Sequence, residues 1–562
     1  MADPEFSYED FSDTEQPSVA PVRKTKKTPK TIIPKTPPKT TPKTTTPTEK
    51  SLNVIVDHTH SPDSEQGSQL SAGVRLAPDG TTPLVPQPSA DPQDPLNWSW
   101  AKKHAVLLAL IPGCLLSDWA LTWGSTVFEL QAQDWDMAVQ AVSNSLSPGI
   151  FMQAPGGILA VPLCQRYGRL PVLFWSQLLS LAVIIGATLA PTYGGFTACR
   201  ALQGFFGAAP QVIGLSVIHD MFFFHERARK INIWAASFLI GPYIGPFISS
   251  LILLKLAWRP DFAVLAGFYA FSVLAVLLLG DETLFDRGGA LGLHQSKSKR
   301  KTTRLALLVG LAGLRAKGRP KIRTVLRHQL ALLARPYLLL PSALFLTPLT
   351  MWTIGLVSTI PLFTLPPPPP AGTGYAFSYL GFALLYLAPI VGTLLAEAYG
   401  HYANDLILRR HLHKHNHTQH APTTLPVPEA RLTAVYPPLT LGVAGLVLFG
   451  QTLQQHHHWA ALAVAWGMVT FATLATTTPI SAYVLDTFPL HAAPAAAWLN
   501  AWRVVGGFSV VYFQLGWVAR AGPGVAFGCQ GAVIAAVGCA VVVTQRFGRA
   551  WRERWPVPEG EN

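Results

Sequence analysis

Charged residues are scarce in this chain. They make up 13% of its 562 residues, whereas 49% are hydrophobic. A soluble domain carries about 25% charged residues, so this shortage points to a membrane protein. Cysteine is also scarce, and the five cysteines lie in apolar runs without paired spacing, which predicts neither a disulfide framework nor a zinc site. No stretch fits the phosphate-binding pattern G-x-x-x-x-G-K-[S/T], so nothing in the sequence indicates an ATP-driven protein.

Long apolar runs recur along the chain from Lys103 onward. Each has about 20 residues, the length that crosses the hydrocarbon core of a bilayer. They predict an all-α membrane protein with 12 transmembrane helices, near residues 104–126, 143–164, 172–190, 196–218, 231–254, 262–280, 337–361, 375–396, 437–454, 459–484, 497–518 and 523–545. A basic stretch between the sixth and seventh runs divides the series into six plus six. This is the layout of secondary transporters, so we expect two six-helix bundles with inverted-repeat pseudo-symmetry.

The polar segments complete the expected domain organisation. A tail rich in Lys, Thr, Pro and Ser cannot bury enough apolar surface to fold alone and is predicted to be disordered. Because no apolar segment follows Met1, we expect no cleavable signal peptide. The predicted parts are a cytosolic tail at 1–95, an N-terminal bundle at 96–280, a basic cytosolic loop at 281–336, a C-terminal bundle at 337–545 and a second cytosolic tail at 546–562.

The placement of positive charge supports this topology. With the N-terminus in the cytosol, 38 of the 43 Lys and Arg residues fall in inside segments and three fall in outside loops. This asymmetry matches the positive-inside rule and predicts that both termini are cytosolic. It also accounts for the net charge of +13 without a nucleic-acid partner. We expect a multi-pass protein of the plasma membrane that acts as a monomer.

Arg200 lies inside the fourth predicted span, where an isolated cation costs several kcal/mol and indicates a functional site. An acidic partner is therefore expected. The first span offers one, because Asp118, Thr122 and Ser125 follow each other at helical spacing on a single face. We predict that Asp118 pairs with Arg200 and that these two residues couple transport to protons. Asp118 would bind either a proton or a cationic group of the solute. The alternative is that Asp118 is a structural acid in a polar helix contact.

Other polar residues inside the predicted spans share faces at helical spacing. They come from spans one, four, eight, ten and eleven. We predict that they line a substrate cavity made of Thr122, Ser125, Gln203, Gln211, Tyr379, Tyr386, Thr473, Asn500 and Arg503.

Several short motifs occur in a fixed order along the chain: D-P-L-N-W-S at 94–99, R-Y-G-R-L at 166–170, R-A-L-Q-G at 200–204, G-P-Y-I-G-P at 241–246, and TTTPISAYVLDTFP with AAAWLNAWRVVGGF at 476–508. This series resembles the major facilitator superfamily, in particular the fungal 12-span drug:proton antiporters. The order of the motifs is more specific than any one of them.

The resemblance implies two bundles that rock around a central site and exchange protons for an exported solute. It links Arg200 to proton coupling. It assigns the cytosolic-loop signature to Arg166, Gly168 and Arg169, and the antiporter motif to Gly241, Pro242, Gly245 and Pro246. The chain departs from the family pattern at two positions. Gln165 stands where the loop signature usually has an acid, and Pro246 replaces the final glycine of the antiporter motif.

The leading prediction is a proton-coupled exporter of small organic molecules, with no enzymatic activity and no cofactor. One alternative is a proton symporter that takes up a cationic nutrient or a polyamine. Another is a membrane sensor or receptor that does not transport and signals through its basic tails. Histidine-rich runs at 409–420 and 456–458 would lie on opposite sides of the membrane without a carboxylate or thiolate pattern, so we predict no metal site.

Overall fold

The computed structural model describes residues 84, 86–285, 304–315, 319–365, 374–416, 428–488 and 491–556. The predicted tail at 1–95 therefore lies almost entirely outside the described residues. The same holds for the side chains of the histidine-rich run at 409–420.

The described chain is helical and contains no β-strand in these ranges. Twelve of its helical stretches are long and apolar enough to cross a membrane, and each overlaps one predicted span. They are Trp100–Thr126, Val139–Tyr167, Arg169–Leu189, Tyr193–Met221, Ile233–Ile252, Trp258–Leu279, Pro336–Thr364, Tyr379–Tyr402, Pro428–Gln455, Trp459–Thr487, Ala492–Ala521 and Pro523–Arg554. The prediction of a 12-span all-α membrane protein is confirmed.

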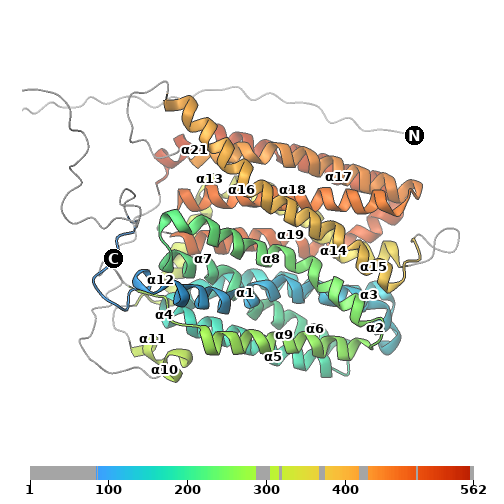
Figure 1. Cartoon of the computed structure of the whole chain (residues 1–562). Coiled ribbons are helices and arrows are strands. Elements are labelled where there is room, and N and C mark those ends of the chain that lie inside the picture. Colours follow the sequence, from blue (N-terminus) through green and yellow to red (C-terminus); the bar gives the residue numbers. More distant parts are fainter. Residues whose placement is uncertain are drawn as a thin grey trace, which may run out of the picture. The chain divides into compact units, whose positions relative to one another are not determined.

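The helices fall into an N-terminal and a C-terminal half, coloured blue to green and yellow to red in Figure 1. The N-terminal half contains α1 (Trp100–Trp123), α2 (Phe128–Trp135), α3 (Val139–Ser143), α4 (Leu146–Tyr167), α5 (Arg169–Leu189), α6 (Tyr193–Gly207), α7 (Ala209–Met221), α8 (Phe224–Ile252) and α9 (Trp258–Leu279). The connection contains α10 (Arg304–Val309), α11 (Leu311–Arg315) and α12 (Ile322–Ala331). The C-terminal half contains α13 (Pro336–Leu339), α14 (Thr347–Thr364), α15 (Tyr379–Leu385), α16 (Leu387–Asn416), α17 (Tyr436–Gln455), α18 (Trp459–Thr487), α19 (Ala492–Ala521), α20 (Pro523–Val537) and α21 (Cys539–Arg554).

Side chains in the connecting segments satisfy backbone groups at several helix starts. Ser99 precedes α1 and accepts a hydrogen bond from the Lys102 amide, and Thr192 does the same for Gly195 at the start of α6. The charged segment at 219–230 is largely helical. Helix α8 begins at Phe224 within it. This helix also runs without a break through Pro242 and Pro246.

Several pairs of helices join the two halves. Helix α4 packs against α19, and α8 packs against α15 and α16. Within the N-terminal half, α4 crosses α6 at very short range because glycines face the neighbouring backbone. A Cβ on Gly204 would lie 2.0 Å from the Gly149 carbonyl oxygen, and one on Gly156 would lie 2.1 Å from that of Phe205. Small residues at such crossings let membrane helices approach closely.

We predict that Gly204→Ala lowers the stability of the folded protein, because its methyl group would overlap the Gly149 carbonyl and force α4 and α6 apart. Overpacking of this kind costs about 1–3 kcal/mol. The measurement is the apparent melting temperature in detergent. Gly267→Ala on α9 is the matched control, since a Cβ there meets no atom within 4 Å. Equal melting temperatures for the two variants would contradict the predicted crossing.

Candidate functional site

A cavity lies between the two halves, with about 80 Å³ open to a water-sized sphere. Six helices line it, three from each half. Its wall combines apolar side chains with threonine hydroxyls and one acidic and one basic residue. The lining residues are Asp118, Leu121 and Thr122 of α1; Ile150 and Gln153 of α4; Leu239, Pro242 and Tyr243 of α8; Thr350, Thr353, Ile354 and Val357 of α14; Thr473 and Thr477 of α18; and Arg503 and Val504 of α19.

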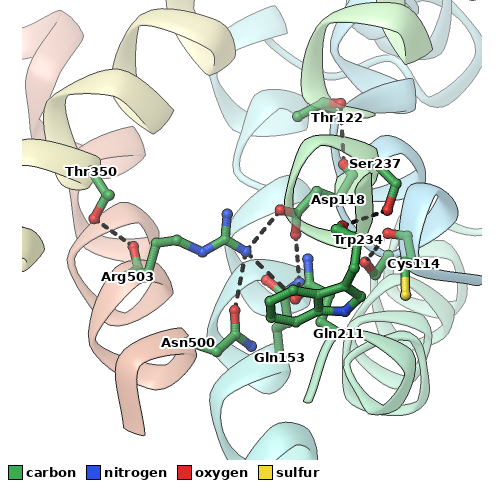
Figure 2. A network of polar contacts seen from close by, with 11 residues as sticks. Cys114, Asp118, Thr122, Gln153, Gln211, Trp234, Ser237, Thr350, Asn500 and Arg503 are labelled. Atoms are coloured by element: carbon green, nitrogen blue, oxygen red, sulfur yellow. Dashed lines mark hydrogen bonds and ion pairs between the residues drawn. The ribbon is translucent and has the colours of Figure 1, made fainter. Parts of the chain in front are cut away.

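An ion pair crosses this cavity from one half to the other. Arg503 Nη2 of α19 lies 2.8 Å from Asp118 Oδ2 of α1. Both side chains are nearly buried, with 11% and 8% of their surface exposed. Figure 2 shows the guanidinium reaching from the C-terminal half toward the carboxylate. The pair therefore joins two halves that the chain connects only through the segment between α9 and α13.

Amide side chains surround the ion pair and hold its members in place. Gln153 donates to Asp118 Oδ1 at 2.6 Å and also approaches Gln211 Oε1 at 3.1 Å. Arg503 donates to Asn500 Oδ1 at 3.0 Å and lies 3.5 Å from Gln211 Oε1. Figure 2 shows this network, which draws on helices α1, α4, α7 and α19. The two charges thus share one set of polar contacts inside an otherwise apolar seam.

Arg200 does not pair with Asp118, contrary to our prediction. Its guanidinium donates instead to the backbone carbonyls of Ala120, at 2.5 Å, and of Leu121, and to Gln203 Oε1 at 3.2 Å. These carbonyls belong to the last turn of α1, where backbone oxygens lack helical partners and carry partial negative charge. Arg200 therefore stabilises the end of α1 from inside the N-terminal half, and Arg503 takes the position beside Asp118.

The other predicted cavity residues divide into three groups. Thr122, Thr473 and Arg503 line the cavity, while Gln211 and Asn500 contact the ion pair from just behind it. Gln203 lies elsewhere, bound to Arg200 and to the Tyr269 hydroxyl. Ser125, Tyr379 and Tyr386 are absent from the lining. Ser125 is buried, Tyr386 packs against Trp466 with ring centroids 4.8 Å apart, and Tyr379 packs on an apolar cluster of the N-terminal half.

Gln153, Tyr243 and Thr353 line the cavity but were not among the predicted residues. Gln153 carried a usable signal, because it is an amide in the middle of an apolar span. Tyr243 lies inside the antiporter motif, for which only the glycines and prolines were predicted to be functional. Thr353 shares a 2.7 Å hydrogen bond with Thr473, and only the pairing of α14 with α18 brings these two hydroxyls together.

The antiporter motif forms the contact between α8 and α1. A Cβ on Gly241 would lie 2.7 Å from the Leu115 carbonyl oxygen, and one on Gly245 would lie 2.8 Å from that of Trp119. The two glycines are four residues apart, so they share one helix face and let the backbones meet. Pro242 points to the cavity instead. The motif thus has one face for helix packing and another for the cavity.

The loop motif is built around Gly168, which links α4 to α5 with a φ of 115°. A Cβ there would lie 2.3 Å from Glu282 Oε2. The Glu282 carboxylate accepts hydrogen bonds from the amides of Arg169 and Leu170, at 3.0 and 3.2 Å, and so caps α5. The Arg169 side chain pairs with Asp220 at the end of α7. Two acids, Asp220 of α7 and Glu282 after α9, therefore serve the motif in which Gln165 replaces the usual acid.

Arg166, the remaining residue of the loop motif, connects to the segment before α12. It donates to the Arg319 carbonyl at 3.4 Å, and Arg319 donates to the Arg166 carbonyl at 3.1 Å. Burial lowers the pKa of the Arg319 guanidinium, and the nearby Glu282 carboxylate opposes that shift. Further along, Trp498 Nε1 of α19 donates to the Gln329 carbonyl of α12 at 2.7 Å. The connecting segment thus contacts both halves.

Comparison with known proteins identifies the family. The profile described as the Major Facilitator Superfamily matches residues 108–511. The chain belongs to the major facilitator superfamily. Its members are transporters, and the two-bundle arrangement of the helices described above agrees with this assignment.

The relatives with similar sequences include fungal transporters. The chain is 25% identical over 429 residues to the efflux pump radE of Floropilus chiversii, covering 76% of each protein. It is 25% identical over 416 residues to the multidrug transporter TPO1_2 of Candida glabrata, covering 72% of this chain and 68% of the relative.

Solved structures show the same fold at lower identity. The human organic anion transporter MFSD10 aligns with a TM-score of 0.52 and 15% identity, covering 78% of this chain and 99% of that one. The xylose transporter XylE of Escherichia coli aligns with a TM-score of 0.54 and 13% identity, covering 82% and 100%.

We predict that Asp118 and Arg503 are coupled in stability, whereas Asp118 and Arg200 are not. Removing one member of a buried pair leaves an uncompensated charge and costs about 3–5 kcal/mol. Arg503→Ala should therefore lower the melting temperature, and adding Asp118→Asn should restore part of it. The combination of Arg200→Ala with Asp118→Asn should show additive losses, since these residues share no direct contact. The measurement is a double-mutant cycle of thermal unfolding in detergent; the reverse pattern would refute the pairing.

Proposed function

We propose that this transporter exports small organic molecules in exchange for protons, by alternating access. The observation that carries the proposal is the ion pair between Asp118 and Arg503, which bridges the two halves inside the cavity. A carboxylate in this position has two possible partners besides Arg503. One is a proton and the other is a cationic group of a solute, and both cannot occupy it together.

Competition for one carboxylate yields exchange. A proton on Asp118 removes its negative charge, so the attraction that joins α1 to α19 weakens and the solute loses its counter-charge. When the proton leaves, Asp118 is again available to Arg503 or to a solute. Each ligand therefore favours a different arrangement of the halves, which is the differential affinity that coupled transport requires.

The amides around the pair would still hydrogen-bond Asp118 and Arg503 when these two residues separate. Gln153 remains to donate to Asp118, and Asn500 remains to accept from Arg503. Neither charge is then left without a hydrogen bond in a low-dielectric seam, where an unpaired charge is costly. The contacts are arranged by half, since Gln153 belongs to the half of Asp118 and Asn500 to that of Arg503.

The rest of the lining fits a small, partly apolar solute. Leu121, Ile150, Ile354 and Val357 offer apolar surface, and the threonines of α14 and α18 offer hydroxyls. Sites that combine apolar walls with a few polar groups suit organic molecules. The names of the relatives from Floropilus and Candida, an efflux pump and a multidrug transporter, support export as the direction.

Arg200 would act on the solute indirectly, through α1. It binds the last turn of α1, the helix that also carries Asp118. We assign it the role of positioning α1 while the proton and solute exchange on Asp118. The Gly241 and Gly245 contacts then let α8 move with α1 as one packed pair.

We also propose that the transporter acts as a monomer in the plasma membrane with both termini in the cytosol. The asymmetry of Lys and Arg along the sequence supports this orientation. In the structure, Arg166, Arg169 and Arg319 gather at one end of the bundles, which would then face the cytosol.

We predict that Asp118→Asn abolishes transport driven by a pH gradient, while the protein still inserts into the proteoliposomes. The amide keeps an acceptor for Gln153 yet cannot bind a proton. The measurement is flux of a cationic dye such as ethidium into proteoliposomes under an imposed pH gradient. Glu553→Gln is the matched control, because this acid is 68% exposed at the far end of α21. Full gradient-driven flux by Asp118→Asn would refute the assignment, and dye movement in the same direction as the protons would identify a symporter.

A further inference from the structure

A second acid is buried in the membrane-spanning part of the N-terminal half, away from the cavity. Asp261 lies in the first turn of α9 and has no exposed surface. Its Oδ2 accepts a hydrogen bond from the Ser249 hydroxyl of α8 at 2.9 Å. Its Oδ1 has no hydrogen-bond partner among the described residues. This carboxyl group takes no part in the ion pair of the cavity.

Two arginines and one acid near this carboxyl group are engaged elsewhere. Arg259, on the same helix, donates to the carbonyls of Thr188 and Ala190. Asp134 of α2 accepts a hydrogen bond from Trp258 Nε1 at 2.7 Å. The guanidinium carbon of Arg200 of α6 lies 5.9 Å from the centroid of the Phe262 ring, and this side chain is bound to carbonyls of α1. None of these cations is hydrogen-bonded to Asp261 in the described part of the chain.

An ionised carboxylate is expensive in such a place. Its neighbours Trp123, Phe196 and Phe262 belong to one apolar cluster. The start of α9 provides a favourable field, but the gain at a helix N-terminus is smaller than the cost of burying an unpaired charge. The carboxyl group is therefore more stable with a proton than without one.

Asp261 is also connected to the antiporter motif. Gly241, Gly245 and Ser249 follow one another at intervals of four residues, so they form one stripe on α8. The two glycines contact α1, and Ser249 ends the stripe by sharing a 2.6 Å hydrogen bond with the Thr126 hydroxyl just after α1. Ser249 thus joins α1, α8 and α9 at one point. The charge on Asp261 therefore affects the hydrogen bonds of Ser249 at this junction.

We propose that Asp261 is a second proton-binding site, which takes up one proton in each transport cycle at the outer end of the seam between α1 and α8. This inference rests on the proposed proton-coupled transport. In the neutral state the carboxyl group and the Ser249 and Thr126 hydroxyls form one uncharged cluster that keeps the seam closed. Loss of the proton leaves a charge that the cluster cannot compensate, so α8 and α9 must separate or admit water there.

The direct test is infrared spectroscopy of the purified protein in detergent between neutral and alkaline pH. The wild type should show a carboxylic-acid C=O band that is lost as the pH rises. Asp261→Asn should remove this band, while Asp118→Asn and the exposed-acid control Asp134→Asn should retain it. A band unchanged in Asp261→Asn would overturn the proposal. If that variant does not fold, a shift of the band in Asp261→Glu supports the assignment, and an unshifted band refutes it.

The functional test measures protons exchanged per ethidium molecule in proteoliposomes, from the pH gradient that just stops dye flux. The ratio should fall by one proton in Asp261→Asn relative to the wild type and stay the same in Asp134→Asn. A ratio unchanged by Asp261→Asn would show that the acid has only a structural role. If the wild type shows no proton-driven flux, the proposed function fails, and the infrared band still decides whether Asp261 binds a proton.

Discussion

A charge inside a low-dielectric seam needs a partner, and the ion pair between Asp118 and Arg503 meets this requirement by using one residue from each half. The buried charge in each half therefore has its counter-charge in the other half. Replacing both residues by apolar ones could make a more stable protein, since buried ion pairs often contribute little net stability. A breakable contact between two rigid bodies is instead what a protein with alternating states requires.

The N-terminal half contains two further polar groups that follow the same constraint in different ways. Arg200 has no carboxylate, but the free carbonyls at the end of α1 supply several acceptors with partial negative charge. Asp261 has no cation, but it accepts a hydrogen bond from the Ser249 hydroxyl, and a bound proton makes it neutral. One buried cation thus stays charged by binding backbone oxygens, and one buried acid lowers its cost by binding a proton. Both lie beside the two helices that the antiporter motif holds together.

The loop motif shows how a departure from the family pattern is accommodated. Gln165 cannot supply a negative charge, and the motif arginines still need acceptors. Asp220 at the end of α7 and Glu282 after α9 supply the negative charges at this end of the bundle. Gly168 makes room for Glu282, because any side chain at that position would overlap its carboxylate. The same segment continues into contacts with α12, so the motif is connected to both halves.

The family could be recognised, and the number and rough position of the spans predicted, from the sequence alone. Apolar runs of sufficient length must be helices in a bilayer, since only helices and closed barrels satisfy their backbone there. Residues on one helix could also be grouped, because spacing determines the face. Thr122 with Asp118, and Asn500 with Arg503, were placed together correctly for this reason.

The partner of Asp118 was decided only by the tertiary structure. Arg200 and Arg503 both lie inside spans, and the sequence offers no measure of which one is closer to α1 at the level of Asp118. The crossing of α4 with α6, set by glycines, directs Arg200 toward the end of α1, and the packing of α4 against α19 brings Arg503 to the carboxylate. Composition and periodicity determine which residues lie in the membrane and which face they share. Distances between helices depend on how the helices pack, and these distances determine which charges pair.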